Sequence, residues 1–214
     1  GYKTDGVFQS WDEVYAYTNA EGGLIQPDAQ PGDFRYKDLN GDGSITAEGD
    51  RANLGKCVPS WTYGINASID WKGIDFSMIW QVVAGNKIFD ATRRTDIPTM
   101  NQPKYVLNRW TGEGSTNEYP RFTVTDPNQN WSKASDFFIK DASYFRLKNV
   151  TLGYTLPAKW TNKVFVKKLR VYVACENALT FTKYDGFDPE IADYVDRGIY
   201  PQSRTVQFGA SITF

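Results

Sequence analysis

Apolar and polar residues alternate in two neighbouring stretches of the chain, residues 61–70 and 74–82. Every second residue of the first stretch is apolar: Trp61, Tyr63, Ile65, Ala67 and Ile69. The second stretch keeps the same alternation, with Ile79 as its one exception. Successive side chains of a β-strand point to opposite faces of the sheet, so this pattern predicts two strands with one apolar and one polar face. The link of Trp71, Lys72 and Gly73 is short enough to join them as a β-hairpin.

Three later stretches show the same pattern: residues 144–156, 168–181 and 204–214. Arg170 and Glu176 lie on the polar side of the second of these. The first is mixed, because Phe145 and Leu147 are out of phase with the apolar residues that follow them, Val150, Leu152, Tyr154 and Leu156. We therefore expect five strands. Helical spacing of apolar residues occurs only at residues 8–17, which favours one helix there.

The connections between the predicted strands alternate in length. A tight turn follows the first strand, about 60 residues (84–143) follow the second, a link that begins at Pro157 follows the third, and about 20 residues follow the fourth. Compact soluble domains rarely contain a structureless loop of 60 residues. Outer-membrane β-barrels have short periplasmic turns and long extracellular loops. If the short turns are periplasmic, the fifth strand descends and the C-terminus lies in the periplasm.

The composition is compatible with a barrel and excludes several other classes. The chain has 214 residues, of which 15% are aromatic and 23% are charged. It contains no apolar run of about 18 residues, which excludes an α-helical membrane protein, whereas barrel strands need only about 9–11 residues with every second one apolar. The net charge is −1 without a basic stripe, so nucleic acid is not an expected partner. Cys57 and Cys175 are too few for a disulfide framework or a metal cluster.

The last predicted strand ends on an aromatic residue. Phe208, Ile212 and Phe214 lie on its apolar face, and the strand resembles the C-terminal signal by which the outer-membrane assembly machinery selects its clients. Such a face suits lipid, and the opposite Thr, Gln and Ser residues suit a wet lumen. The alternative is a half-buried strand of a soluble β-sandwich. The terminal Phe, the loop alternation and five such strands together favour the barrel.

Longer motifs resemble those of a known transporter family. They are GVFQSWDEVYAY (6–17), QPGDFRYKDLNGDG (30–43), TYGINASIDWKGIDFS (62–77), LNRWTGE (107–113), IKDASYFRLKNVTLGYTLP (139–157), LRVYVACENALTFTKYDGFDPE (169–190) and YPQSRTVQFGASITF (200–214). In this order they are similar to the C-terminal third of the SusC/RagA-type TonB-linked outer-membrane transporters of Bacteroidetes, which import glycans or peptides.

The resemblance implies that the chain is one part of a larger machine. It implies a barrel of about 22 strands with an N-terminal plug, a TonB-contacting segment and a SusD-type surface lipoprotein that closes over the barrel mouth. Plug and TonB box lie outside this sequence, and five strands cannot close such a barrel. The expected fold is all-β, with antiparallel strands that form the C-terminal part of a transmembrane β-barrel. Residues 1–60 are expected as an extracellular loop region, and residues 61–214 as five strands with a long extracellular loop at about 84–143.

One motif, residues 38–50 (DLNGDGSITAEGD), has the pattern of a calcium loop. Its oxygen ligands would be the side chains of Asp38, Asn40 and Asp42 and the carbonyl of Ser44. Calcium is bound by several oxygens that converge in a tight turn, here at Gly43. The twelfth position is Gly49 instead of an acid, so Glu48 or Asp50 would have to complete the site, which lowers the expected affinity. The alternative is a polar Asn-Gly/Asp-Gly turn without metal.

The remaining candidates for ligand contact are loop aromatics. Trp110, Tyr119 and Trp131 are candidates to stack on sugar rings, and the alternative is a role in packing or in the aromatic girdles of a barrel. The chain has no His and no Gly-x-Ser-x-Gly elbow, and its carboxylates form no assignable catalytic pair. No catalytic residue and no enzyme activity are therefore expected.

Two functions stay open on these grounds. The first is a segment of a TonB-dependent importer in the outer membrane, in contact with lipid and acting by ligand binding and plug movement. The second is a soluble calcium-dependent carbohydrate-binding module built as a β-sandwich. A parent gene several times longer than this chain, with a signal peptide and a plug, would exclude the second.

Overall fold

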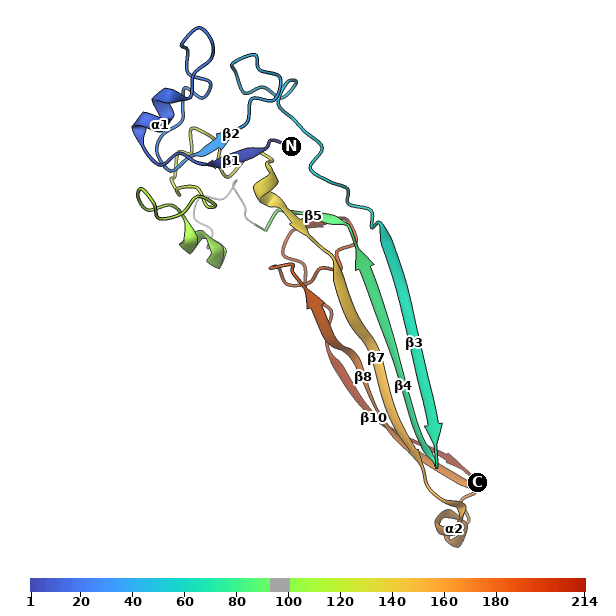
Figure 1. The fold of residues 1–214 in the computed structure, drawn as a ribbon. Coiled ribbons are helices and arrows are strands. Elements are labelled where there is room, and N and C mark those ends of the chain that lie inside the picture. Colours follow the sequence, from blue (N-terminus) through green and yellow to red (C-terminus); the bar gives the residue numbers. More distant parts are fainter. Residues whose placement is uncertain (93–100) are drawn as a thin grey trace. The chain divides into compact units, whose positions relative to one another are not determined.

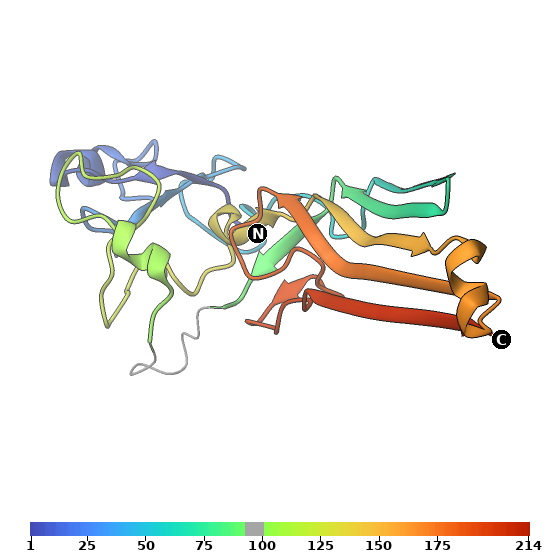
Figure 2. The same ribbon diagram turned by 90° about the horizontal axis from the view of Figure 1, so that it is seen from below.

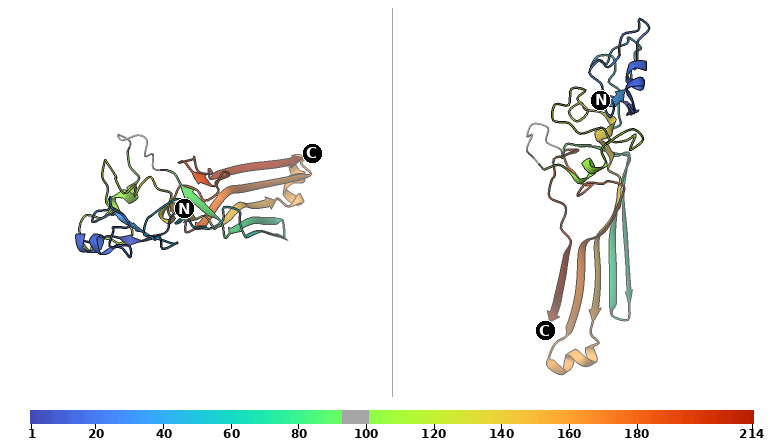
Figure 3. Two further views of the ribbon diagram at one scale, coloured as in Figure 1. Left: turned by 90° about the horizontal axis from the view of Figure 1, so that it is seen from above. Right: turned by 90° about the vertical axis from the view of Figure 1, so that its left-hand side faces the viewer.

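A computed structural model gives the fold and describes residues 1–92 and 101–214. The five long strands are β3 (Trp61–Trp71), β4 (Ile74–Ala84), β7 (Tyr144–Thr155), β8 (Lys168–Thr182) and β10 (Thr205–Thr213). They form one sheet in the order β10-β8-β7-β4-β3, in which every neighbouring pair is antiparallel (Figures 1 and 3). All five predicted strands are confirmed, and each lies beside the one that precedes it in the series.

The other elements are short. They are β1 (Thr4–Val7), α1 (Trp11–Ala16), β2 (Phe34–Tyr36), β5 (Lys87–Asp90), η1 (Lys104–Asn108), η2 (Asp136–Phe138), β6 (Ile139–Asp141), α2 (Ala158–Thr161), η3 (Asn162–Val164) and β9 (Val195–Asp196). β1 pairs with β2, and a second small sheet has the order β6-β5-β9. The helix expected within residues 8–17 is α1. It begins after Ser10, whose hydroxyl accepts a hydrogen bond from the Glu13 N–H and so satisfies one of the free amides of the first turn.

The chain divides into two compact units. One comprises residues 1–55, 89–140 and 195–197, and the other comprises residues 56–88, 141–194 and 198–214. The five-stranded sheet belongs to the second unit. Residues 84–143, expected to form one long loop, are therefore divided between the units, and of these the described residues 89–92 and 101–140 fold together with residues 1–55.

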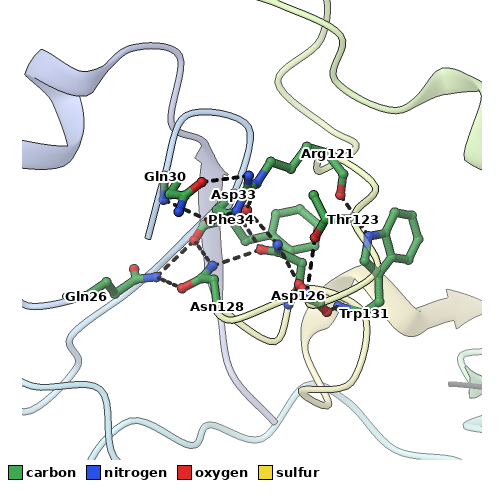
Figure 4. A network of polar contacts seen from close by, with 10 residues as sticks. Gln26, Gln30, Asp33, Phe34, Arg121, Thr123, Asp126, Asn128 and Trp131 are labelled. Atoms are coloured by element: carbon green, nitrogen blue, oxygen red, sulfur yellow. Dashed lines mark hydrogen bonds and ion pairs between the residues drawn. The ribbon is translucent and has the colours of Figure 1, made fainter. Parts of the chain in front are cut away.

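A buried polar network joins these two segments of the first unit (Figure 4). Asp33 is fully buried and accepts hydrogen bonds from the Arg121 guanidinium and the Asn130 side-chain amide. The side-chain amide of Gln26 donates to the carbonyl of Phe34. Buried polar groups cost stability unless each finds a partner. Residues 26–34 and 121–130 therefore stabilise one another's conformation.

The β3–β4 hairpin closes through a two-residue turn. Trp71 pairs with Ile74, and the residues between them, Lys72 and Gly73, have φ angles of 49° and 88°. Two positive φ values define the type I′ turn, whose twist matches that of the flanking strands. The predicted tight link is thereby confirmed.

A bulge in β7 explains the mixed phase of its sequence. Leu147 pairs with Trp80 and Asn149 pairs with Ile79, so Lys148 has no partner on β4. One extra residue reverses the alternation of all side chains that follow it. The residues before and after Lys148 therefore share one apolar face although their sequence phases differ.

The five-stranded sheet has an apolar face that continues across all of its strands. The pairs Ala67–Met78, Met78–Val150, Val150–Cys175 and Cys175–Val206 follow one row from β3 to β10. Many side chains of this face are exposed, with Ile69 at 62% and Phe208 at 83%. The opposite face is polar in the same way, as in the row Asn66, Ile79, Asn149, Glu176 and Thr205.

We predict that Gly73→Ala destabilises the hairpin by roughly 1–3 kcal/mol, because its φ of 88° strains any L-residue and because the added Cβ would lie 2.7 Å from the Thr155 carbonyl oxygen. The measurement is the urea midpoint of the folded protein in detergent micelles. Gly64→Ala is the matched control, since a Cβ at Gly64 meets no atom within 4 Å. Equal losses in the two variants would contradict the turn assignment.

Candidate functional site

A buried ion cluster lies on the polar face of the sheet. Arg146 of β7 has a side chain that is only 3% exposed. Its guanidinium donates to Asp188 at 2.6 Å, to Glu190 at 2.7 Å and to the Thr180 hydroxyl at 2.9 Å. Lys148, the bulge residue, donates to both carboxylate oxygens of Glu190 at 2.7 and 2.9 Å. Two cations of one strand thus bind two carboxylates of the loop that follows β8.

Asp188 connects the two ends of that loop. Its carboxylate accepts hydrogen bonds from the backbone N–H groups of Glu190 and Gln202 as well as from Arg146. Burial by itself favours the protonated form, but these hydrogen bonds and the charge of Arg146 outweigh it and lower the pKa of Asp188. The loop is therefore held against β7 by an ionised carboxylate at neutral pH.

The loop and the strand ends enclose an open polar cavity of about 370 Å³. Its lining includes Asn177, Thr180 and Thr182 of β8, Phe187 of the loop, and Arg204. Arg146 is saturated by its carboxylates, whereas Arg204 has no ion-pair partner within the described part of the chain. The Phe187 ring is 73% exposed. The cavity therefore offers hydrogen-bond donors, one cation and an aromatic ring to a polar ligand.

A second charged pair occupies the same face nearer the β3–β4 turn. The Arg170 guanidinium donates to Asp75 at 2.8 Å through Nε, and both side chains lie where a Cβ of Gly153 would be. The ring of Tyr172 covers Gly209 of β10 in the same way. Glycine at these two positions lets long side chains lie flat on the sheet. The predicted location of Arg170 on the polar face is confirmed, together with a partner that its sequence pattern did not show.

Residues 38–50 form a turn that is stabilised by its own amides. The Asp38 carboxylate accepts hydrogen bonds from the N–H groups of Gly41 and Gly43. Asp50 is fully buried, and its carboxylate accepts from the N–H groups of Leu39 and Thr46. These two acids therefore hold the loop conformation through hydrogen bonds to its backbone.

The other predicted calcium ligands are on the surface of the loop. Asn40 donates its side-chain amide to Asp42, and the N–H and hydroxyl of Ser44 also donate to Asp42. These hydrogen bonds lower the pKa of Asp42, that from Asn40 most strongly. Glu48 is exposed. Among the described residues no three His, Cys, Asp or Glu side chains gather as a metal cluster, and calcium binding stays a prediction.

The aromatic residues considered for ligand stacking pack within the first unit. Trp131 is 3% exposed, and its indole N–H donates to the Arg121 carbonyl. Tyr119 lies edge-on to Phe137. Trp110 is half-buried against the core of β1 and β2. Trp131 therefore presents no ring face to a ligand, whereas the exposed Phe187, which the sequence did not single out, lines the polar cavity beside the ion cluster.

The residues considered as an assembly signal lie on the apolar face of β10. Phe208 is 83% exposed, Ile212 52% and Phe214 76%. Their exposure agrees with the alternation from which they were chosen, and their role in assembly stays a prediction. In the described residues no helix is both long and apolar enough to cross a membrane.

An antiparallel meander with one exposed apolar face and one charged, polar face has the architecture of a transmembrane β-barrel wall. No family model matches the chain. Over all of its residues it is 30% identical to the TonB-dependent receptors P3 and P26 of Formosa agariphila, and it spans 22% of each. With SusC of Bacteroides thetaiotaomicron it shares 25% identity over 89% of its residues and 18% of that receptor.

Solved structures give the same result. The whole chain superposes on 22% of a transporter chain in the open-open state of the RagAB peptide importer, with a TM-score of 0.70 and 22% identity. A second RagAB structure gives 0.69 and 25% identity over 86% of the chain and 21% of its counterpart. The chain thus spans about a fifth of its relatives. It matches a SusC/RagA-type segment of a TonB-dependent receptor, which confirms the family and the fold class that its motifs and strand pattern indicated.

We predict that Arg146→Met releases the loop of residues 183–204, because removal of one partner of a buried ion pair costs about 3–5 kcal/mol. Hydrogen exchange should show loss of amide protection in this loop. Lys87→Met is the matched control: the pair of Lys87 with Asp141 is exposed, so its loss should cost less than about 1 kcal/mol. Unchanged protection in Arg146→Met would contradict the role of the cluster.

The same cluster has a defined pH dependence. The pKa of Asp188 is lower in the folded protein than in the unfolded chain. Its stabilising contribution is therefore complete above the unfolded carboxyl pKa of about 3.9 and disappears as the pH falls through the lower folded value. Loop protection should be constant from neutral pH down to about pH 5 and should decrease only in stronger acid.

For the loop of residues 38–50 we predict a higher melting temperature in millimolar calcium than in chelator, since a ligand that binds only the folded state stabilises it. Asp38→Asn combined with Asp42→Asn should remove the difference. Magnesium at the same concentration is the control for general ionic effects. An identical melting temperature with calcium and with chelator would exclude a calcium site.

Proposed function

We propose that this chain forms part of the wall and surface loops of a TonB-dependent outer-membrane importer of glycans or peptides. The observation that carries the proposal is the apolar face that continues across all five long strands. Exposure of apolar surface to water costs about 25 cal/mol per Å², so a face of this extent needs lipid beside it. A β-sandwich would cover it with a second sheet, and in the described residues it is exposed.

In this proposal the polar face lines the lumen. The ion cluster of Arg146 fixes the loop of residues 183–204 on that face, and the cavity beside it borders the path of the ligand. Hydroxyl and amide side chains, one cation and the Phe187 ring suit sugars as well as peptides. The chain contributes binding and shape, and the import step needs no covalent chemistry.

The proposed partners follow from the relatives. The parent protein would couple to TonB through a segment outside this chain and would work with a SusD-type surface lipoprotein. The similarity to TonB-dependent receptors, to SusC and to the RagAB peptide importer supports this assignment. The long connections would be extracellular and the turns at β3–β4 and β7–β8 periplasmic.

A matched pair of substitutions in β3 tests the lipid contact. Ala67 lies on the apolar face and Asn66 on the polar face, and both are exposed in the chain by itself. Arginine on the lipid side of a barrel strand near mid-membrane costs about 2–4 kcal/mol, whereas the lumen side tolerates it. In the full gene product we expect Ala67→Arg to reduce the amount of receptor that assembles in the outer membrane and Asn66→Arg to assemble normally.

Two results would overturn the proposal. If Ala67→Arg and Asn66→Arg assembled equally well, the apolar face would not contact lipid. If deletion of the parent gene left the uptake of both labelled oligosaccharides and labelled oligopeptides unchanged, the import function would be wrong. Retained uptake of one class with loss of the other would identify the ligand.

A further inference from the structure

The connection between β7 and β8 is short, yet it exposes large apolar side chains. It consists of α2 and the 3-10 turn η3, which together cover residues 158–164. Trp160 is 58% exposed, Val164 67% and Phe165 91%. In a water-exposed turn, side chains of this size would be replaced by polar ones at no cost to the fold, because none of the three is buried.

The same connection is strongly cationic. Residues 157–168 contain four lysines, Lys159, Lys163, Lys167 and Lys168, and no Asp or Glu. None of these lysines has a carboxylate within salt-bridge distance in the described part of the chain. The acids nearest in sequence are Asp141 and Glu176. Two exposed aromatic side chains beside lysines that form no salt bridge are complementary to an anionic lipid surface, into which rings insert while ammonium groups bind phosphate.

The backbone at Phe165 adds an independent observation. Phe165 ends η3 in the left-handed conformation, with φ at 58°. Glycine or asparagine usually occupies this position, because a bulky side chain is strained there. The chain thus holds an aromatic ring at a strained and nearly fully exposed position. Transfer of the ring from water into an apolar phase offsets both costs.

The connection lies at the end of the five-stranded sheet that also holds the β3–β4 turn, next to the apolar face proposed to contact lipid. Figures 1 and 2 show α2 at the same end as the β3–β4 turn and the C-terminal strand end. The Lys167 N–H donates to the Thr213 carbonyl at 2.8 Å, and Leu169 pairs with Ile212 on the apolar face. The β3–β4 turn repeats the chemistry, since Trp71 is 62% exposed and the ammonium of Lys72 lies 4.9 Å from its ring centroid.

We propose that residues 157–168 form a binding site for anionic phospholipids of the periplasmic leaflet. Trp160 and Phe165 insert between the lipid chains, and Lys159, Lys163 and Lys167 bind the headgroup phosphates. The site anchors the periplasmic end of the barrel wall at a fixed depth. The inference rests on the proposed function, because the orientation across the outer membrane defines which leaflet the connection meets.

The test uses the full gene product, purified in neutral detergent and titrated with phosphatidylglycerol or with phosphatidylcholine, with native mass spectrometry to count the bound lipids. We expect the receptor to retain phosphatidylglycerol in preference to phosphatidylcholine. The triple variant Lys159→Gln, Lys163→Gln, Lys167→Gln should weaken that binding about fivefold for each lysine removed. The matched control removes three exposed lysines elsewhere, Lys56→Gln, Lys104→Gln and Lys183→Gln, and should bind like the wild type.

A second variant separates the anchor from folding. Phe165→Gly removes the ring and relieves the strained backbone, so it should keep the heat-resistant mobility of the folded barrel while it loses phosphatidylglycerol. A photo-crosslinking amino acid at position 165 identifies what contacts this residue in cells, and a phospholipid adduct is expected.

Several outcomes would overturn the inference. These are equal binding of phosphatidylglycerol by the two triple variants, an equal affinity for both lipids, a crosslink to a periplasmic protein, and a crosslink to lipopolysaccharide, which would put the connection at the cell surface. Failure of the proposed function would appear differently, because the wild-type gene product would then be absent from the outer-membrane fraction.

Discussion

In a sheet that crosses a bilayer, every backbone N–H and C=O has to pair with a neighbouring strand, because the hydrocarbon core offers no water to replace a lost hydrogen bond. Because backbone pairing is the same in every strand, the alternation of apolar and polar side chains is what assigns each face of the sheet to lipid or to the lumen. A slip of one residue in any strand would move its whole apolar set to the polar face. The long unbroken alternation of β3 and β10 follows from this constraint, and so does the way in which β7 departs from it.

The departure in β7 connects the fold to its candidate site. The bulge at Lys148 restores the apolar phase, and it also places the side chain of Lys148 beside that of Arg146. Both cations then reach Glu190, and Arg146 reaches Asp188. Bulges commonly re-aim side chains next to functional regions. The same residue that keeps the lipid face continuous thus helps to hold a loop over the polar face.

The strands could be predicted from the sequence because alternation with a period of two is visible within a single segment. The hairpin could be predicted because a link of two or three residues can join neighbouring strands only by a tight turn. The bulge could not be predicted, since the sequence shows the phase change at Lys148 but not the pairing with β4 that explains it. The acceptors of Arg146 are 42 and 44 residues away in the chain, beyond any local pattern. The packing of the described residues of 89–140 against residues 1–55 could not be predicted for a similar reason. Asn130 and Asp33 have the local sequence of loop residues, and only the structure shows the hydrogen bond between them.

The connections at the two ends of the five-stranded sheet differ in charge and in burial. At the end where β8 finishes, the following loop is rich in carboxylates, and the buried Arg146 and the half-buried Lys148 of β7 bind two of them. Order at that end therefore comes from contacts within the chain. At the end where β8 begins, the connection has lysines without carboxylates and rings without a core. No contact within the described residues compensates for those exposed rings, and a protein under selection for solubility would lose them. Their presence beside an apolar sheet face is explained if the bilayer is their partner, as proposed above, so that one end of the wall would be ordered by the protein and the other by lipid.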